Sequence, residues 1–121
     1  MSNGRDIEAD IKAAGADRAP RVTIEDVHAA IASEHYFTAD DGEWGASRHA
    51  NKPKHPQLSL LTFCVIVMRN GFTVTGESAC ASPENFRPEI GRKLAREKAI
   101  DKVWSLLGYG LRERLAQQPN T

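Results

Sequence analysis

The fold is decided by residues 58–75, which read LSLLTFCVIVMRNGFTVT. Residues 58–69 are rich in β-branched, aromatic and other apolar side chains, a composition typical of a β-strand. Asn70-Gly71 follows, and both residues tolerate the positive φ that the two central positions of a type I′ turn require. Residues 72–75 then return toward the first strand. We therefore predict an antiparallel β-hairpin over this stretch.

Both faces of the first strand are apolar. Alternate residues of a strand point to opposite faces, so one face consists of Phe63, Val65 and Val67, and the other holds Leu60, Cys64, Ile66 and Met68. An apolar sheet face has to be covered from water. We expect a helix on one face and a second subunit on the other, so that the protein forms a homo-oligomer of two or more copies.

A helix and then a loop are predicted before the hairpin. Thr23 can cap the first helical turn, and Asp26 follows three residues later, where an acidic side chain favours the positive end of a helix. An apolar stripe at helical spacing follows, made of Ile24, Val27, Ala30 and Ile31. The pattern fades at residues 36–38. Residues 39–57 are polar, contain two prolines and lack apolar periodicity, which predicts a long loop.

Helical segments are predicted after the hairpin. Ser82-Pro83-Glu84 has the pattern of a helix start, and a restart at Pro88 begins a long helix over residues 88–107. Gly108 is the predicted stop, because glycine tolerates the left-handed conformation that ends many helices. A last short helix is predicted over residues 109–116. The predicted class is therefore α+β: a small antiparallel sheet packed on a long C-terminal helix, with an N-terminal helix.

Length and composition indicate one small domain. The chain has 121 residues, of which 40% are hydrophobic and 26% charged, an ordinary globular composition. Residues 1–21 contain few large apolar side chains, so we predict a flexible arm there, although Ile7 and Ile11 also allow a weak helix. The domain itself is predicted over residues 22–117, followed by a frayed tail over residues 118–121.

The formal net charge is zero, with 16 basic and 16 acidic residues. A neutral total argues against a protein held on nucleic acid by bulk charge, so no specific nucleic-acid partner is expected. The charges are segregated along the chain, however. Residues 1–47 hold ten acids and four bases, whereas residues 87–121 hold eight bases and four acids. A neutral protein with a local basic surface suits a small anionic ligand better than a long polyanion.

The sequence predicts a cytoplasmic protein with reduced thiols. No apolar run approaches the length of a membrane span, and the first residues lack the apolar segment of a secretory signal. The two cysteines are then expected to stay reduced. In the predicted hairpin the residue opposite Cys64 is near Glu77, which disfavours a disulfide between Cys64 and Cys80.

No motif in the sequence predicts catalysis or metal binding. His28 and His35 are seven residues apart and match no zinc-ligand spacing. The chain has neither a Gly-x-Ser-x-Gly elbow nor a Gly-Lys-Ser/Thr phosphate loop. We therefore expect a protein that is not an enzyme and that carries no cofactor and no metal.

The candidate ligand site lies around the predicted C-terminal helix. Arg92 and Arg96 are four residues apart and project from one helix face, so two guanidinium groups can hold one phosphate-bearing ligand. Phenylalanines can stack on a base, and an asparagine can give a directed hydrogen bond. The predicted ligand-binding residues are Phe72, Asn85, Phe86, Arg92, Arg96 and Arg112. The alternative is that this mixed-charge helix face is simply solvated.

Short motifs that occur in order along residues 23–115 resemble a known family. They include Asn70-Gly-Phe-Thr-Val74, Gly76-Glu-Ser-Ala-Cys80, Pro83-Glu-Asn-Phe86, Glu89-Ile-Gly-Arg-Lys-Leu-Ala-Arg-Glu-Lys-Ala99 and Gly108-Tyr-Gly-Leu-Arg-Glu-Arg114. Together they resemble the small phage and prophage proteins labelled gp forty-nine-like. The resemblance implies a phage or prophage origin, and hence an infected or lysogenic bacterial host, more than it implies a mechanism.

The chain more distantly resembles the first type of phage Thoeris anti-defence proteins. The likeness lies in size, in the order strand, turn, strand and long helix, and in the arginines of that helix. Those proteins sequester cyclic ADP-ribose-like immune signals and, in some cases, cyclic oligonucleotides. The resemblance implies a protein that counters host anti-phage defence by binding a small phosphorylated nucleotide, without catalysis. No ligand-contacting residue is carried over from them.

Three other functions stay open from the sequence. The chain can instead be a phage early protein that binds and modulates a host protein through its acidic arm and the 39–57 loop. It can also be a nucleic-acid binder that uses residues 87–114, although its neutral charge argues against this. The third alternative is an enzyme that acts on a nucleotide.

Overall fold

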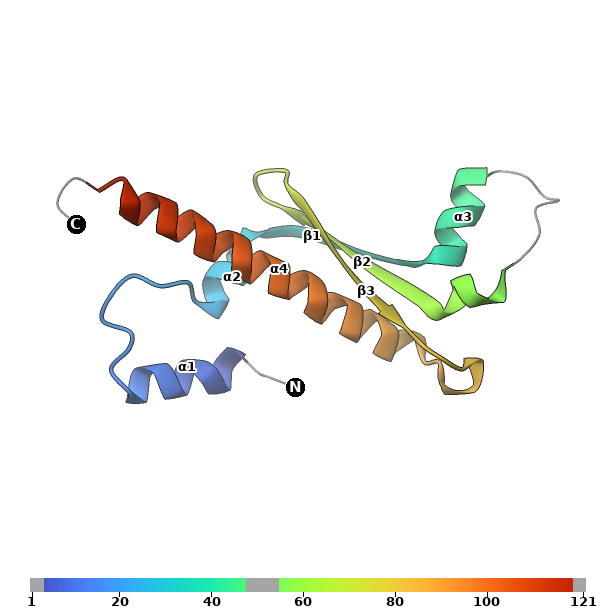
Figure 1. The fold of residues 1–121 in the computed structure, drawn as a ribbon, viewed down its shortest axis with the longest axis horizontal. Helices are drawn as coiled ribbons and strands as arrows, with labels where there is room; N and C mark the ends of the chain where they lie inside the picture. The colour runs from blue at the N-terminus through green and yellow to red at the C-terminus, as the bar shows by residue number, and fades with distance from the viewer. Residues whose placement is uncertain (1–3, 48–54, 119–121) are drawn as a thin grey trace. The chain divides into compact units, whose positions relative to one another are not determined.

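The structure is a computed structural model, and it describes residues 4–47 and 55–118. The elements follow in the order α1 (Gly4–Ala13), α2 (Ile24–Ala30), β1 (Ile31–Thr38), α3 (Ala39–Ser47), η1 (Pro56–Leu60), β2 (Leu61–Met68), β3 (Thr73–Ala79), η2 (Pro83–Asn85) and α4 (Pro88–Ala116), where η marks short 3-10 helices (Figure 1). The predicted α+β class is confirmed. The chain divides into two compact units, one formed by Ile31–Lys102 and the other by Met1–Ala30 with Val103–Thr121.

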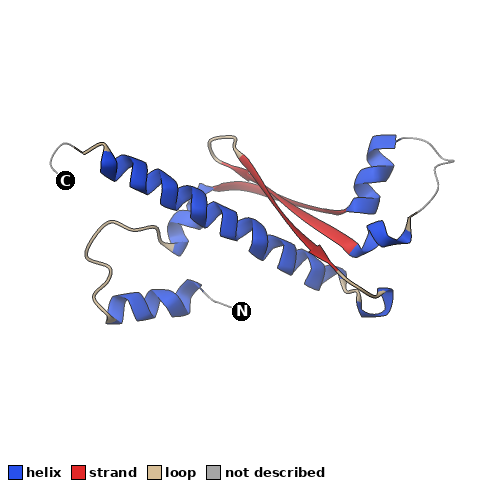
Figure 2. Cartoon of the chain, in the orientation of Figure 1, coloured by secondary structure: helices blue, strands red, loops and turns tan. Residues whose placement is uncertain are grey.

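The unit Ile31–Lys102 is built on a three-stranded antiparallel sheet in the order β1-β2-β3 (Figure 2). The predicted hairpin is present as β2 and β3. The residue opposite Cys64 was predicted near Glu77, and in the structure it is the adjacent Gly76. Cys64 also pairs with Tyr36 on the other side, in β1.

The register differs because the hairpin loop holds three residues and not two. The Gly71 N–H donates to the Met68 carbonyl at 2.8 Å, and the Met68 N–H donates to the Phe72 carbonyl at 2.7 Å. Gly71 has a φ of 90°, the left-handed conformation found at the bulge of a three-residue hairpin loop. The Asn70 side chain accepts a hydrogen bond from the Phe72 N–H at 3.0 Å, which stabilises this turn.

One face of the sheet carries the core of this unit. Cys64 and Ile66 of β2 are fully buried, and so are Ala95 and Ala99 of α4. The first half of α4 crosses this face (Figure 1), so the predicted helix on one side of the strand is confirmed. The approach is close at Gly76, where an added Cβ would overlap the Ala95 carbonyl oxygen and lie 2.5 Å from the Ala99 nitrogen.

The opposite face of the sheet is only half-buried by the chain itself. Phe63, Val65 and Val67 alternate with fully covered neighbours on β2, and each keeps an intermediate exposure. Phe37 of β1 is 38% exposed on the same face, and its ring contacts that of Phe63 with centroids 5.6 Å apart. The two faces therefore differ strongly in burial although both are apolar.

Residues 31–47 differ from the prediction. Ile31 was expected in the helical stripe, but it begins the strand β1, because residues 31–38 gain backbone hydrogen bonds along one edge by pairing with β2. Residues 39–47, predicted as part of a loop, form α3. Thr38 and Asp41 cap this helix reciprocally: the Thr38 N–H donates to the Asp41 carboxylate at 3.0 Å, and the Asp41 N–H donates to the Thr38 hydroxyl at 3.1 Å. Residues 48–54 of the predicted loop lie outside the described residues.

The long helix does not stop at Gly108. Helix α4 runs without a break from Pro88 to Ala116, so the separate last helix is also wrong. A glycine inside a helix costs only about 1 kcal/mol. The apolar positions Leu107, Leu111 and Leu115 continue at helical spacing across it, and each is partly shielded from solvent.

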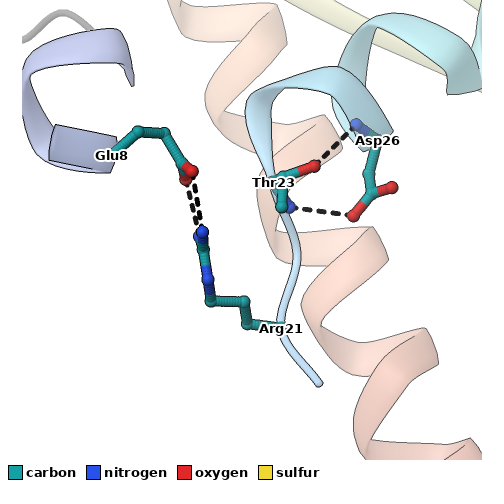
Figure 3. Close-up of polar contacts among 4 residues, drawn as sticks. All are labelled: Glu8, Arg21, Thr23 and Asp26. Atoms are coloured by element: carbon teal, nitrogen blue, oxygen red, sulfur yellow. Dashed lines mark hydrogen bonds and ion pairs between the residues drawn. The ribbon is translucent and has the colours of Figure 1, made fainter. Parts of the chain in front are cut away.

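In the other unit, polar contacts hold the N-terminal segments together (Figure 3). Helix α1 occupies part of the segment predicted as a flexible arm, and Glu8 of this helix accepts two hydrogen bonds from Arg21, at 2.6 and 2.8 Å. The predicted cap of α2 is confirmed, since the Asp26 N–H donates to the Thr23 hydroxyl and the Thr23 N–H donates to the Asp26 carboxylate. Residues 1–3 and 119–121 lie outside the described residues.

Candidate functional site

A cavity of about 240 Å³ lies at the end of the sheet where β1 ends and β2 begins. The start of α4 lies at the same end (Figure 2). The cavity belongs entirely to the unit Ile31–Lys102. It is lined by Tyr36, Phe37, Thr38, Asp41, Thr62, Phe86, Pro88 and Arg92. Two of the six predicted ligand-binding residues, Phe86 and Arg92, therefore share one cavity.

Local structure explains how α4 and its approach supply the cavity wall. The Phe86 N–H donates to the Pro83 carbonyl at 3.2 Å, which ends η2 and turns the chain toward α4. Proline at position 88 is suited to the first turn of a helix, because its missing N–H has no intrahelical partner there. Arg92 follows one turn later. Gly91 lets the sheet come close, since a Cβ there would lie 2.8 Å from the Thr62 hydroxyl.

The polar groups of the cavity include a cation and an unsatisfied hydroxyl. Within residues 4–47 and 55–118, no carboxylate lies within 4.0 Å of the Arg92 guanidinium. Thr62 is 3% exposed, and its Oγ1 is buried without a hydrogen-bond partner among the described groups. Asp41 has one carboxylate oxygen engaged by the Thr38 N–H. The site thus offers a positive charge, a hydroxyl and a partly used carboxylate.

Arg96, the other predicted phosphate ligand of the helix, is occupied by Glu34. Its Nε donates to Glu34 Oε1 at 2.6 Å and its Nη2 donates to Oε2 at 3.3 Å. The hydrogen bond to Glu34 raises the pKa of Arg96. The Tyr36 hydroxyl donates to the same Glu34 oxygen at 2.8 Å. Burial, followed by this hydrogen bond, raises the pKa of Tyr36, so Tyr36 presents a neutral ring to the cavity.

The remaining predicted residues lie elsewhere. Phe72 is in the hairpin loop at the far end of β2 and is 55% exposed. Asn85 is exposed in η2, next to Phe86 but not in the cavity lining. Arg112 lies in the part of α4 that belongs to the other unit. Phe86 and Arg92 line the same cavity, and none of these three residues is part of its lining.

Several cavity residues were not predicted from the sequence. Tyr36, Thr38 and Thr62 come from the two strands, and Asp41 comes from α3. Residues 34, 36 and 38 of β1 lie on the same face of the strand. Their spacing of two residues was the signal in the sequence that could have indicated a strand here. It was missed because the helical stripe before it extends to Ile31 without a turn residue between helix and strand.

The geometry suits binding of a small ligand. A guanidinium holds an anionic group by charge-assisted hydrogen bonds, and the aromatic side chains Tyr36 and Phe86 offer flat apolar surfaces to a planar ring. In the part of the chain that the structure describes, no three His, Cys, Asp or Glu side chains gather as a metal site would require. No helix in that part is long and apolar enough to cross a bilayer.

Comparison with known proteins assigns a family. No curated protein and no solved structure matches the chain. A family model described as "Phage protein (N4 Gp49/phage Sf6 gene 66) family" matches residues 22–115. The matched range runs from just before α2 to the last turn of α4, and so contains every residue that lines the cavity. The chain belongs to this family of phage proteins.

Proposed function

We propose that this phage-family protein binds and sequesters a small phosphorylated nucleotide signal of the host, of the cyclic ADP-ribose or cyclic oligonucleotide kind, and so counters anti-phage defence without catalysis. The observation that carries the proposal is that Arg92 and Phe86 line one cavity with the Tyr36 ring. A phosphorylated nucleotide combines an anionic group with a flat aromatic ring, and this wall offers a partner for each.

The size of the cavity sets how much of the ligand it holds. Its volume of about 240 Å³ is below the 300–1,000 Å³ typical of pockets that enclose a drug-sized molecule. We therefore assign to it one base and one phosphate of a larger ligand, with the rest of that ligand outside. Binding without bond breaking needs no general base or nucleophile, and the groups that line this cavity are sufficient for it.

The two arginines of α4 take different roles in this proposal. Arg92 has no carboxylate partner among the described residues, so the whole positive charge of its guanidinium is available to a phosphate. Arg96 already pairs with Glu34, and a phosphate would have to compete with that carboxylate. We therefore assign the phosphate contact to Arg92 and a positioning role to Arg96, which holds Glu34 and, through it, the Tyr36 hydroxyl.

The test is calorimetric titration of the full chain with glycocyclic ADP-ribose and with cyclic di- and trinucleotides. A hydrogen bond to a charged group contributes about 1.5–3 kcal/mol, so Arg92→Gln should weaken binding about 10- to 100-fold. Lys93→Gln is the matched control, because it removes one positive charge from the same turn of α4 at a residue outside the cavity lining. The recovered ligand should have an unchanged mass.

A second variant tests whether the ligand enters the cavity. Thr62→Val replaces an unsatisfied buried hydroxyl with a methyl group of similar shape, so the unfolding free energy should stay the same or rise by about 1 kcal/mol. If a ligand group satisfies this hydroxyl, the same variant loses affinity while its fold is intact. Absence of heat with every nucleotide, or equal affinity in the wild type and Arg92→Gln, would refute the proposal.

A further inference from the structure

Charges of both signs line the cavity, and the negative one has no role in holding a phosphate. Among the described residues of the lining, Arg92 of α4 is the cation and Asp41 of α3 is the carboxylate. We propose that Asp41 selects the ligand by repelling the adjoining phosphates of a diphosphate or triphosphate, so that the cavity takes a nucleotide whose phosphates are separate phosphodiesters. This inference rests on the proposed function and narrows its ligand to the cyclic oligonucleotide kind.

The start of α3 holds the Asp41 side chain in place. Its carboxylate accepts the Thr38 N–H at 3.0 Å, while the Asp41 N–H donates to the Thr38 hydroxyl at 3.1 Å. These reciprocal hydrogen bonds form a capping box. The other carboxylate oxygen has no partner among the described residues. Asp41 therefore presents a fixed negative charge at the end of the sheet where α3 and the first turn of α4 lie (Figure 1).

Asp41 and Arg92 act on a ligand separately, because they do not pair with each other. Within residues 4–47 and 55–118, no ion pair joins the two side chains. Both residues are exposed, whereas Thr62 is buried, so the two charges lie at the mouth of the cavity and the hydroxyl lies deeper. A sphere of about 240 Å³ is about 8 Å across, which equals the Debye length at physiological ionic strength. Salt therefore screens only part of the interaction between a bound phosphate and either charge.

The balance of charge favours a ligand that brings a single negative charge to the cavity. A phosphodiester carries one such charge, and Arg92 can hold it. A diphosphate places a second anionic group directly beside the first, and the described lining offers that group a carboxylate and no further cation. Cyclic oligonucleotides carry separate phosphodiesters, whereas ADP, ATP and cyclic ADP-ribose contain a diphosphate. Repulsion by Asp41 thus discriminates against ADP and ATP as competitors, since specificity also comes from contacts that disfavour the wrong ligand.

Calorimetric titration of the full chain with a cyclic dinucleotide, with ADP and with ATP, all without magnesium, tests the inference. Two unit charges 4 Å apart in water change an affinity about fivefold. Asp41→Asn should therefore raise the affinity for ADP and ATP, relative to that for the cyclic dinucleotide, about fivefold or more, and added salt should reduce this gain. Asp40→Asn is the matched control, because it removes a carboxylate from the same turn of α3 outside the cavity lining, and it should leave the ratio unchanged.

A second pair of variants keeps the test decisive if Asp41→Asn fails to fold. Glutamate and glutamine both serve at this position of a capping box, so Asp41→Glu and Asp41→Gln retain the start of α3 and differ in charge. The first should keep the preference of the wild type and the second should lose it. Equal ratios in these two variants, or tighter binding of cyclic ADP-ribose than of cyclic dinucleotides by the wild type, would overturn the inference while the proposed function stands. If the wild type binds no nucleotide, the proposed function fails and the inference fails with it.

Discussion

Replacing Gly76 by alanine tests how closely α4 is seated on the sheet. Gly76 is a buried residue of β3, and its backbone does not need the left-handed conformation that favours glycine. Glycine is required here only because there is no room for a Cβ atom between β3 and α4. An added Cβ would overlap the Ala95 carbonyl oxygen and lie 2.5 Å from the Ala99 nitrogen, both in the backbone of α4.

The cost of Gly76→Ala follows from this geometry. Ordinary contacts between heavy atoms lie near 3.5–4.0 Å, so the helix and the strand must separate by about 1 Å. A gap of that size forfeits about a quarter to a half of the dispersion energy at each contact, including those around the fully buried Ile66. Overpacking costs about 1–3 kcal/mol when side chains can yield. Because helix backbone cannot yield in this way, we expect a loss of about 3 kcal/mol or more.

Urea unfolding followed by circular dichroism measures this loss directly. For 121 residues, an unfolding entropy of about 2.1 cal/mol/K per residue converts 3 kcal/mol into a fall in Tm of about 12 °C. The matched control is Gly108→Ala, where an added Cβ meets nothing within 4 Å. This control lies inside α4 and should gain up to about 1 kcal/mol from the better helix propensity of alanine.

One result would refute the reasoning. If Gly76→Ala unfolds within about 0.5 kcal/mol of the wild type, the range of an ordinary surface substitution, then α4 does not rest on β3 at this point. A large loss in both variants would also contradict it, because the effect would then not depend on the space available at Gly76.

Two further predictions concern single polar groups. The hydrogen bond from Arg21 lowers the pKa of Glu8 below its ordinary value of 4.5, so the ion pair stabilises the folded chain above that value and the contribution is lost as the pH falls through the lowered pKa. The protection of the α1 amides against exchange, relative to an unstructured chain at the same pH, should therefore fall in acid in the wild type, whereas in Glu8→Gln it should be reduced already at neutral pH. Burial raises the pKa of the Cys64 thiol, and Cys64 is fully buried whereas Cys80 is partly exposed. Titration with a thiol reagent should thus modify Cys80 in the native protein and Cys64 only after denaturation; rapid reaction of both would contradict this.

The hairpin could be predicted from local sequence because its signals are local. The run of apolar and β-branched residues over 61–68 and the Asn70-Gly71 pair identified two strands and the turn between them. The number of loop residues, two or three, fixes which residues of β2 and β3 pair. The observed pairing places Ile66 and Val74 on the same face, where α4 buries them. The register therefore differed by one residue from the prediction.

The candidate site could be predicted only in part. Phe86 and Arg92 could be found because a helix start and a helical spacing of charges are visible in the sequence. Tyr36 and Thr62 could not, because neither has a chemical signal of its own. They become cavity residues only when β1 pairs with β2. The same pairing brings Glu34 to Arg96. Arg96 is therefore already paired with a carboxylate, although helical spacing alone had grouped it with Arg92 as a phosphate ligand.

The sequence by itself determined the α+β class, the hairpin, the cap of α2 and the chemical character of each strand face. These follow from side-chain period and capping chemistry, which act over a few residues. Tertiary structure alone decided that residues 31–38 are a strand, that α4 passes through Gly108, and which apolar face remains open. Those outcomes depend on contacts between segments far apart in the chain, where the free energy gained by pairing and burial exceeds the small local preferences of the residues involved.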